Sequence, residues 1–503
     1  MSAATEKGLE HVDVLIVGAG LSGVGAACVL RKQMPGKSFA ILEARDAIGG
    51  TWDLFRYPGI RSDSDMFTLG YSFRPWEDSK AIADGPSILR YVRETAREYG
   101  VEERVRFGHR VVSADWSSEQ ARWTVTAERT DTGEQVQLTA GFLYGCTGYY
   151  RYDQGYTPEF PGIDGFGGQV IHPQHWPEGL DYAGKRVVVI GSGATAVTLV
   201  PSMAEKAAKV TMLQRSPTYI ATLPATDRLA TGLRRFLPER AVYAIVRWKN
   251  VGRMMLSYQL SRRAPKLMRR VLRKGVEMQT PDGYDVGTHF EPRYDPWDER
   301  LCLVPDGDLF RSLRQGKAEI VTDRIETFTE TGIRLHSGRE LEADIVVTAT
   351  GLNLLLIGGI EPSINGEAVD MSQAVGYKGM MFGGIPNMAI ALGYTNASWT
   401  LKCDLVAEYV CRLLAHMDAN GYRVATPRAP DPSQPTDPFI DLRSGYVMRS
   451  IDQLPKQGAT HPWRLHQNYP KDIRLLKRGP VDDQMDFARA PVPAPAEEPV
   501  AAA

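Results

Sequence analysis

The sequence of 503 residues predicts an α/β fold with two related domains and a helical insertion in the second. Two stretches predict this fold, residues 11–43 and residues 186–216. Each has an apolar run, a glycine-rich turn, a helical pattern and a second apolar run. This order is typical of a buried parallel strand, a turn that receives phosphate groups, and a helix that packs on the sheet. We therefore expect two Rossmann-like dinucleotide-binding domains.

The first glycine-rich turn follows an apolar run that ends at Val17. Gly18 permits the tight turn, Gly20 lets the backbone approach a pyrophosphate, and Gly23 lets the helix pack closely on the strand. The next predicted strand ends at Glu43, twenty residues after Gly23, where a carboxylate accepts hydrogen bonds from ribose hydroxyls. This spacing predicts a site for FAD or NAD. The alternative is a glycine-rich βα turn without a ligand.

The second turn is Gly191-Ser192-Gly193-Ala194-Thr195-Ala196, followed by a predicted helix over residues 197–208. The strand after it ends on Arg215 and Ser216, and Arg215 lies nineteen residues after Ala196. An arginine with a hydroxyl neighbour favours a 2′-phosphate, so this site is predicted to bind NADP(H). The alternative is an ordinary surface arginine. Two such sites predict a flavoenzyme reduced by NADPH, whose two domains must face each other for hydride transfer.

Residues 49–63 predict a loop, because they hold paired glycines and a Pro-Gly turn. The loop carries arginines, aromatic residues and acids, and loops on such scaffolds frequently carry sites. The alternative is an ordinary surface turn. Elsewhere we expect a helix over residues 82–99, a small sheet with strands in residues 105–116 and 123–138, buried strands over residues 142–148 and 344–351, and a helix that opens at residues 394–399.

Residues 226–274 are helical by pattern and heavily basic, with aromatic residues and a Met254-Met255 pair between the charges. One interpretation is attachment to an anionic membrane surface. The other is an inserted helical subdomain with a solvated basic face and an apolar face packed on the rest of the chain. The sequence favours the second interpretation.

Composition gives broad limits. A hydrophobic content of 43% and a charged content of 24% are ordinary for a globular protein. A net charge of −1 gives no general attraction to nucleic acid. The five cysteines form no CxxC pair, which predicts a reducing compartment and no disulfide framework. Without a signal peptide or membrane span in the pattern, we expect a cytoplasmic protein, and we predict no metal site.

Two longer motifs add a family resemblance. The segment Phe166 to Pro177 fits the pattern FxGxxxHxxxW followed by Pro or Asp, with His172 and Trp176 at its fixed positions. Residues 49–63 fit a second pattern of the same family. Over residues 10–488 the chain resembles the Baeyer–Villiger monooxygenases, which are class B flavoprotein monooxygenases. The resemblance implies an FAD-binding domain at residues 8–150 and 353–488, an NADP-binding domain at 160–224 and 300–352, a helical insertion at 225–299 and a disordered tail at 489–503.

The resemblance also implies an activity. NADPH would reduce FAD, and a C4a-peroxyflavin would insert one oxygen atom of O2 next to a ketone carbonyl to give an ester or lactone. Thioethers and thioamides are expected as further substrates. Arg300 matches the active-site arginine of the family, and Asp63 matches the acid that orients it. Without the resemblance, Arg300 could pair with Asp298 or Glu299.

The remaining site residues also follow from the resemblance. Predicted FAD-binding residues are Gly18, Gly20, Ser22, Gly23, Glu43, Thr51, Trp52, Asp53, Leu54, Asp63 and Val111. Predicted NADP-binding residues are Arg61, Ser62, Gly191, Ser192, Gly193, Ala194, Thr195, Ala196, Val197, Arg215 and Ser216. His172 is interpreted as a structural residue near the interdomain linker. One departure is Glu299, because relatives carry a lysine there that holds the 2′-phosphate.

Three other functions compete with this one. A flavin monooxygenase that acts mainly on sulfur or nitrogen would share the glycine turns, but Trp176-Pro177 favours the Baeyer–Villiger branch. A pyridine nucleotide–disulfide reductase needs a dithiol pair, which the sequence lacks. A flavin-carrying protein that only binds membranes would use the basic helices. The sequence leaves the physiological substrate and the oligomeric state open.

Overall fold

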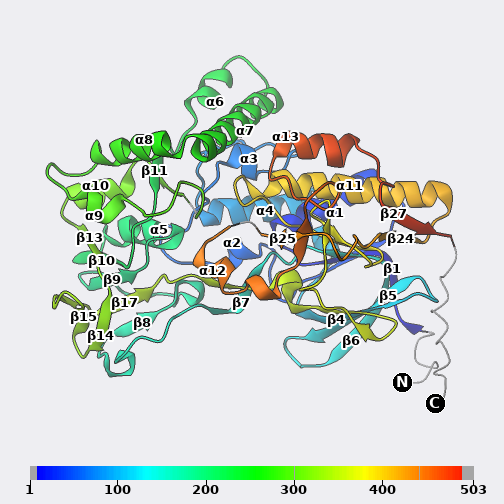
Figure 1. Ribbon diagram of the computed structural model, residues 1–503, viewed down its shortest axis with the longest axis horizontal. Helices are drawn as coiled ribbons and strands as arrows, with labels where there is room; N and C mark the ends of the chain where they lie inside the picture. Colours follow the sequence, from blue (N-terminus) through cyan, green and yellow to red (C-terminus); the bar gives the residue numbers. More distant parts are fainter. Residues whose placement is uncertain (1–7, 300, 441, 490–503) are drawn as a thin grey trace.

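The computed structural model describes residues 8–299, 301–440 and 442–489, and the predicted tail at 489–503 lies almost entirely outside these ranges. Figure 1 shows two α/β units side by side, one around strand β1 (His11–Val17) and the other around strand β9 (Arg186–Ile190). We call them the first and second units. Both contain parallel strands covered by helices, which confirms the predicted α/β class.

The first unit has a nine-stranded sheet in the order β20-β19-β4-β5-β6-β1-β2-β3, and β23 also pairs with β6. Strand β1 is parallel to β2 and β6, and Val14, Leu15 and Ile16 are fully buried, as expected for a strand covered on both faces. Helices α1 (Leu21–Gln33) and α11 (Trp399–Asn420) pack together on the sheet. The other strands are β2 (Phe39–Leu42), β3 (Val105–Arg106), β4 (His109–Ser117), β5 (Arg122–Arg129), β6 (Gln135–Gly145), β19 (Glu361–Ile364), β20 (Glu367–Ala368) and β23 (Met388–Ile390).

Strand β6 corrects the predicted break between the small sheet, which was expected to end at residue 138, and the buried strand expected from residue 142. Its first half pairs antiparallel with β5, and its second half pairs parallel with β1, where Phe142 lies opposite Val14. A Cβ atom on Gly141 would lie 3.1 Å from the Asp13 carbonyl oxygen, so glycine fits tightly beside β1 and does not mark a turn. One strand therefore joins the two predicted sheets into one.

The second unit has a five-stranded sheet in the order β13-β10-β9-β17-β8, in which every pair is parallel. Helix α5 (Ala194–Met203) starts three residues before the predicted boundary. The other elements are β8 (Gln169–Ile171), β10 (Lys209–Gln214), β13 (Ala318–Thr322), β17 (Ile345–Thr348), α10 (Asp308–Arg314), and a small antiparallel sheet of β14 (Ile325–Thr329), β15 (Gly332–Leu335) and β16 (Glu340–Glu342).

The two chain crossings between the units pair with each other, as β7 (Tyr150–Gly155) and β18 (Leu352–Leu354). His172 lies against this ribbon. Its Nδ1 accepts from the Gln174 N–H at 3.2 Å, so its Nε2 donates to the Gly351 carbonyl oxygen at 3.1 Å. Burial lowers the pKa of the His172 imidazole. These contacts agree with a structural role for His172 at the linker.

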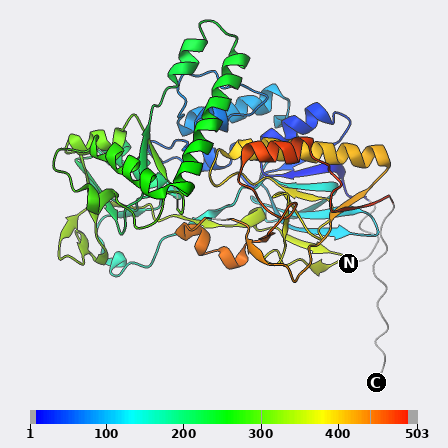
Figure 2. The same ribbon diagram turned by 45° about the horizontal axis from the view of Figure 1, so that its top comes forward.

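The helical insertion consists of α6 (Arg228–Leu233), α7 (Glu239–Arg263), α8 (Pro265–Glu277) and α9 (Val286–Phe290). In sequence it interrupts the second unit, yet α7 packs on the first unit beside α3 (Met66–Leu69). Figure 2 shows α6 and α7 projecting above both units. The buried Arg247 guanidinium donates to the Phe67 and Gly70 carbonyl oxygens at 2.9 and 2.8 Å and lies 3.4 Å from the Asp404 carboxylate. A buried charge thus fixes α7 to the first unit.

The Arg247→Met substitution should lower the free energy of unfolding by about 3 kcal/mol, because Asp404 would lose its buried partner. Arg273→Met is the matched control. Arg273 pairs with Glu277 and Glu291 at a half-exposed site, so its loss should lower the free energy of unfolding much less. Denaturant unfolding of both variants measures the difference. Equal costs would show that Arg247 does not fix the helix.

The remaining elements complete the chain. They are α2 (Thr51–Leu54), α4 (Gly85–Glu98), α12 (Gly445–Met448), α13 (Tyr469–Asp472), β11 (Ile220–Leu223), β12 (Cys302–Pro305), β21 (Gly376–Tyr377), β22 (Met381–Phe382), β24 (Val424–Pro427), β25 (Thr436–Pro438), β26 (Lys456–Gly458), β27 (Met485–Ala488), a π-helical turn (Ile473–Arg478) and short 3-10 turns (Glu102–Arg104, Ile163–Gly165, Pro173–His175, Leu356–Gly359, Ile451–Gln453). No helix in the described ranges combines the length and the apolar character that crossing a membrane requires.

Candidate functional site

The first glycine turn lies at the carboxyl end of β1, between β1 and α1. Gly18 has a φ of +102°, and a Cβ there would lie 2.7 Å from the Cys146 carbonyl oxygen. A Cβ on Gly23 would lie 1.8 Å from the Gly18 carbonyl oxygen. Gly20 differs, because a Cβ there meets only Gly50, at 3.5 Å. Gly20 precedes the first turn of α1 without a capping side chain, so the helix N–H groups can receive an anion.

Glu43 closes one side of this turn. Its Oε2 accepts from the Ala19 N–H at 2.7 Å, and its Oε1 accepts from the Arg45 N–H at 2.9 Å. Burial raises the pKa of the Glu43 carboxyl, and the two N–H donors oppose that shift. A carboxylate has about four lone-pair sites, so two remain for ribose hydroxyls. Val111 lies near this end of the sheet, on β4, two residues after His109, whose N–H donates to the Glu43 carbonyl oxygen at 2.9 Å.

Residues 49–54 lie over the same turn. The Gly49 N–H donates to the Ala19 carbonyl oxygen at 3.1 Å, and the Thr51 Oγ1 lies 3.2 Å from the Tyr152 hydroxyl. From the other side, the Trp399 Nε1 donates to the Ser22 Oγ at 2.8 Å. These contacts place Ser22 and Thr51 around the glycine turn. The residues present thus form a cradle that fits a dinucleotide.

Asp53 is buried beneath this cradle. Its carboxylate lies 2.5 Å from Arg45, 2.9 Å from Arg93 and 3.4 Å from Arg56. Three guanidinium groups occupy its oxygens, so the carboxylate acts to position the loop. Its neighbours Trp52 and Leu54 pack toward the first and second units respectively.

The loop continues into the second unit, and the alternative of an ordinary surface turn is wrong. Phe55 and Tyr57 are buried in the core of that unit. A Cβ on Gly59 would lie 1.9 Å from the Ser202 Oγ of α5. Burial raises the pKa of the Tyr57 phenol, and the nearby charge of Asp63 raises it further. One loop therefore connects the first glycine turn to the helix of the second.

The second glycine turn has the same form. Gly191 has a φ of +134°, and a Cβ there would lie 2.3 Å from the Ala349 carbonyl oxygen. Nothing lies within 4 Å of a Cβ on Gly193, which precedes α5. The Ser192 Oγ donates to the Ser216 carbonyl oxygen at 3.1 Å, so the turn and the exposed end of β10 at Arg215 and Ser216 lie together. Ala194 and Thr195 are half-buried in the first turn of α5, while Ala196 and Val197 are buried.

Arg61 and Ser62 lie where the loop meets the second unit. The Arg61 guanidinium lies 2.5 Å from the Asp308 carboxylate and 3.5 Å from the Val197 carbonyl oxygen. Ser62 is buried, and its Oγ accepts from the Ser64 N–H at 2.9 Å. Arg300 lies outside the described residues. Two residues later, the Cys302 Sγ lies 3.9 Å from the Ser192 carbonyl oxygen, so β12 begins beside the second glycine turn.

The comparisons with known proteins agree with this geometry. The family described as "Flavin-binding monooxygenase-like" matches residues 11–248. The chain is 58% identical to the FAD-containing monooxygenase EthA of Mycobacterium tuberculosis over 486 residues, which cover 96% of this chain and 99% of that protein. The chain belongs to the family of FAD-containing monooxygenases.

A second relative supports this family, and a solved structure shares the fold. The putative FAD-containing monooxygenase MymA of Mycobacterium tuberculosis is 55% identical over 96% of this chain and 98% of its own length. A solved structure, an oxidized steroid monooxygenase bound to NADP, has the same fold with a TM-score of 0.73. It covers 95% of this chain and 99% of its own, at 24% identity. The predicted flavoprotein monooxygenase is confirmed.

Two pockets of this FAD-containing monooxygenase were not predicted from the sequence. The aromatic pocket, lined by Tyr149, Trp399, Phe439 and Tyr446, lies beyond the carboxyl ends of β6 and β23. Tyr149 stacks on Trp399 with ring centroids 5.2 Å apart. Ligands bind at this edge of open α/β sheets. In the sequence, only the helix predicted to begin at residues 394–399 indicated this pocket.

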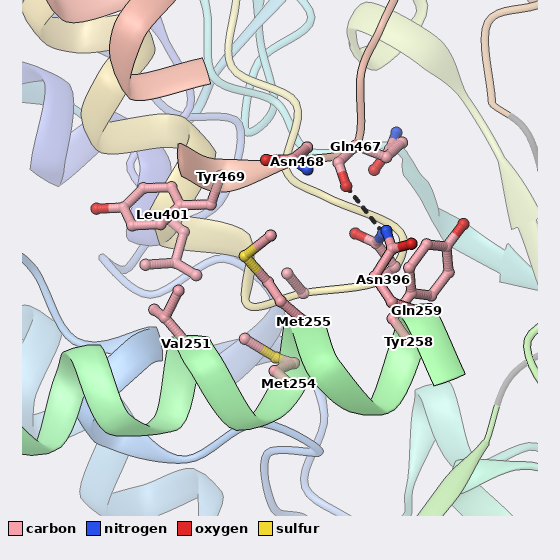
Figure 3. A pocket seen from close by; sticks show the side chains of 11 residues that line it. Val251, Met254, Met255, Tyr258, Gln259, Asn396, Leu401, Gln467, Asn468 and Tyr469 are labelled. Carbon is pink, nitrogen blue, oxygen red and sulfur yellow. Dashed lines mark hydrogen bonds between the residues drawn. The ribbon is translucent and has the colours of Figure 1, made fainter. Parts of the chain in front are cut away.

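The methionine pocket lies between α7 and the start of α11 (Figure 3). Met254 and Met255 point into it from α7, and Leu401 and Tyr469 face them. The Asn396 Nδ2 donates to the Gln467 carbonyl oxygen at 3.0 Å, and Gln467 also lines the aromatic pocket. Gln467 therefore lines both pockets.

Proposed function

We propose that this FAD-containing monooxygenase is an NADPH-dependent Baeyer–Villiger enzyme. It would insert one oxygen atom of O2 next to a ketone carbonyl to give an ester or lactone, and it would also oxidise thioethers and thioamides. The observation that carries the proposal is the loop of residues 49–63, which starts at one glycine turn and ends at the helix of the other. Such a loop can respond to both cofactors. The motif from Phe166 to Trp176 adds support.

Different residues of the chain would bind FAD, bind NADPH and stabilise charge on the reacting oxygen. FAD, when bound, supplies the acceptor for hydride from NADPH and the chemistry that activates O2. Helix α1 and Glu43 would hold its pyrophosphate and ribose, and Arg215 with Ser216 would hold the 2′-phosphate of NADPH. The aromatic pocket would exclude water. Arg300 would offer a fixed positive charge and donors where negative charge develops on the reacting oxygen, and Asp63 would orient it.

Product analysis tests the proposal. The purified protein is incubated in air enriched in heavy oxygen with NADPH and a set of ketones and thioethers. We expect an ester that carries one labelled oxygen, identified by mass spectrometry. Sulfoxide without ester would assign the chain to the sulfur- and nitrogen-oxidising alternative. NADPH consumption that yields only hydrogen peroxide with both substrate sets would contradict the proposal.

Cofactor preference is a separate prediction. Burial raises the pKa of the Glu299 carboxyl, and Arg215 lies close enough for its charge to oppose that shift. Glu299 therefore competes with a 2′-phosphate for Arg215. We expect kcat/KM to favour NADPH over NADH, and Arg215→Ala should reduce that preference about tenfold to a hundredfold. Glu299→Gln should increase it. Equal kcat/KM for the two cofactors in the unaltered protein would contradict the role of Arg215.

We also propose a place of action. The expected site is the cytoplasm, with peripheral attachment to a membrane surface through the basic helices. The cysteines support a reducing compartment, because all five are buried and none forms a disulfide. The exposed basic side chains of α6, α7 and α8 support the attachment to a membrane surface.

A further inference from the structure

Exposed apolar side chains gather on the helical insertion. Of the thirteen large apolar residues exposed among the described ranges, ten lie between Leu229 and Met278. The most exposed are Phe236 at 84%, Met278 at 78% and Leu256 at 61%. A single exposed apolar residue is ordinary, whereas a contiguous group indicates a contact surface. The prediction that the insertion packs its apolar residues on the rest of the chain therefore holds for only part of them.

The exposed residues follow the helical period. On α7, Ile245, Leu256 and Leu260 are spaced by eleven and four residues and are exposed on one side, while Val246 is buried in the first unit. Trp248 is also exposed, and its ring centroid lies 5.9 Å from that of Tyr469. Leu267 and Val271 on α8 and Met278 directly after it are spaced by four and seven residues, so they share one face. Figure 1 shows α6, α7 and α8 along one edge of the molecule. We call their exposed side the insertion face.

Positive charge surrounds these apolar residues. Residues 228–278 contain fourteen Lys and Arg but only two acids, Glu239 and Glu277, which pair with Arg234 and Arg273. Six exposed cations form no ion pair with a described residue: Arg235, Arg240, Arg263, Lys266, Arg270 and Lys274. A surface with apolar residues among cations matches a lipid layer with anionic headgroups.

We propose that the insertion face docks on anionic lipid bilayers, with α7 and α8 lying in the plane of the headgroups. A second copy of the chain fits this face less well, because a twofold contact would bring the same cations against each other. The charge of the insertion face therefore favours one partner, an anionic bilayer. This inference deepens the proposed peripheral attachment and gives it an orientation.

Vesicle cosedimentation of the full-length protein, without NADPH, tests the docking. We expect binding to phosphatidylcholine vesicles that contain phosphatidylglycerol, weak binding to pure phosphatidylcholine, and release by salt. The double variant Leu256→Glu/Leu267→Glu should bind at least about tenfold more weakly. Met448→Glu, at an exposed residue outside the insertion, is the matched control. Thermal unfolding of each variant checks that the chain is folded.

Three outcomes would overturn the docking. In the first, the unaltered protein stays in the supernatant with both kinds of vesicle. In the second, Met448→Glu weakens binding as much as the double variant does. In the third, the protein binds no vesicles and instead self-associates, and Leu256→Glu abolishes the self-association. None of them depends on oxygenation, so a failure here is distinct from a failure of the proposed function.

Discussion

Gly20→Ala should leave the chain folded but without FAD, whereas Gly23→Ala should lose the fold around the first glycine turn as well. A Cβ on Gly20 meets only Gly50 at 3.5 Å, an ordinary contact, but it would lie where a pyrophosphate approaches the start of α1. A Cβ on Gly23 would lie 1.8 Å from the Gly18 carbonyl oxygen, so α1 would have to move away from β1. Such overpacking costs about 1–3 kcal/mol or more.

Two measurements separate the variants. Flavin absorbance after purification and titration with FAD should show an affinity about a hundredfold lower for Gly20→Ala, with unfolding of the FAD-free protein unchanged. Gly23→Ala should unfold at lower temperature even without FAD. Gly36→Ala is the control, because nothing lies within 4 Å of a Cβ there. Normal FAD retention by Gly20→Ala would place the dinucleotide elsewhere.

Arg300→Ala should reduce ester formation about a thousandfold while FAD content and reduction by NADPH stay near those of the unaltered protein. In a pocket closed to water, a fixed guanidinium stabilises charge that develops on an oxygen atom, and loss of one such donor costs about a hundredfold to a thousandfold in rate. Asp63→Asn should cause a smaller loss, because the arginine would remain but lose its orienting charge. Product yield and single-turnover reduction by NADPH measure the two steps separately.

The control for this variant is Arg293→Ala, which removes an exposed arginine from the same segment. Arg300→Lys should recover part of the charge but not the planar pair of donors. If Arg300→Ala formed ester at the normal rate, the arginine would be only a surface or ion-pairing residue, as its neighbours Asp298 and Glu299 would allow. Loss of flavin reduction together with ester formation would instead indicate a role in binding NADPH.

The sequence by itself predicted the elements whose cause is local. The apolar run of β1, the glycines at 18, 20 and 23 and Glu43 at the end of the second strand lie within about thirty residues of each other, and so do their counterparts from β9 to Arg215. Tight turns that need a positive φ leave few residues but glycine. The α/β class and the flavoprotein family therefore followed from the sequence. The site residues remain predictions, and the structure places several of them together.

The tertiary structure decided what depends on distant partners. Strand β6 continues through residue 141 because β5 and β1 pair with its two halves, and no local pattern shows a partner strand. Phe55 and Tyr57 enter the core of the second unit, although their segment has the composition of a surface loop. Arg247 is buried because α7 packs on Asp404 and the carbonyl groups after α3, whereas its basic neighbours stay in solvent. Composition alone cannot separate these arginines, because burial is set by packing between segments far apart in the chain.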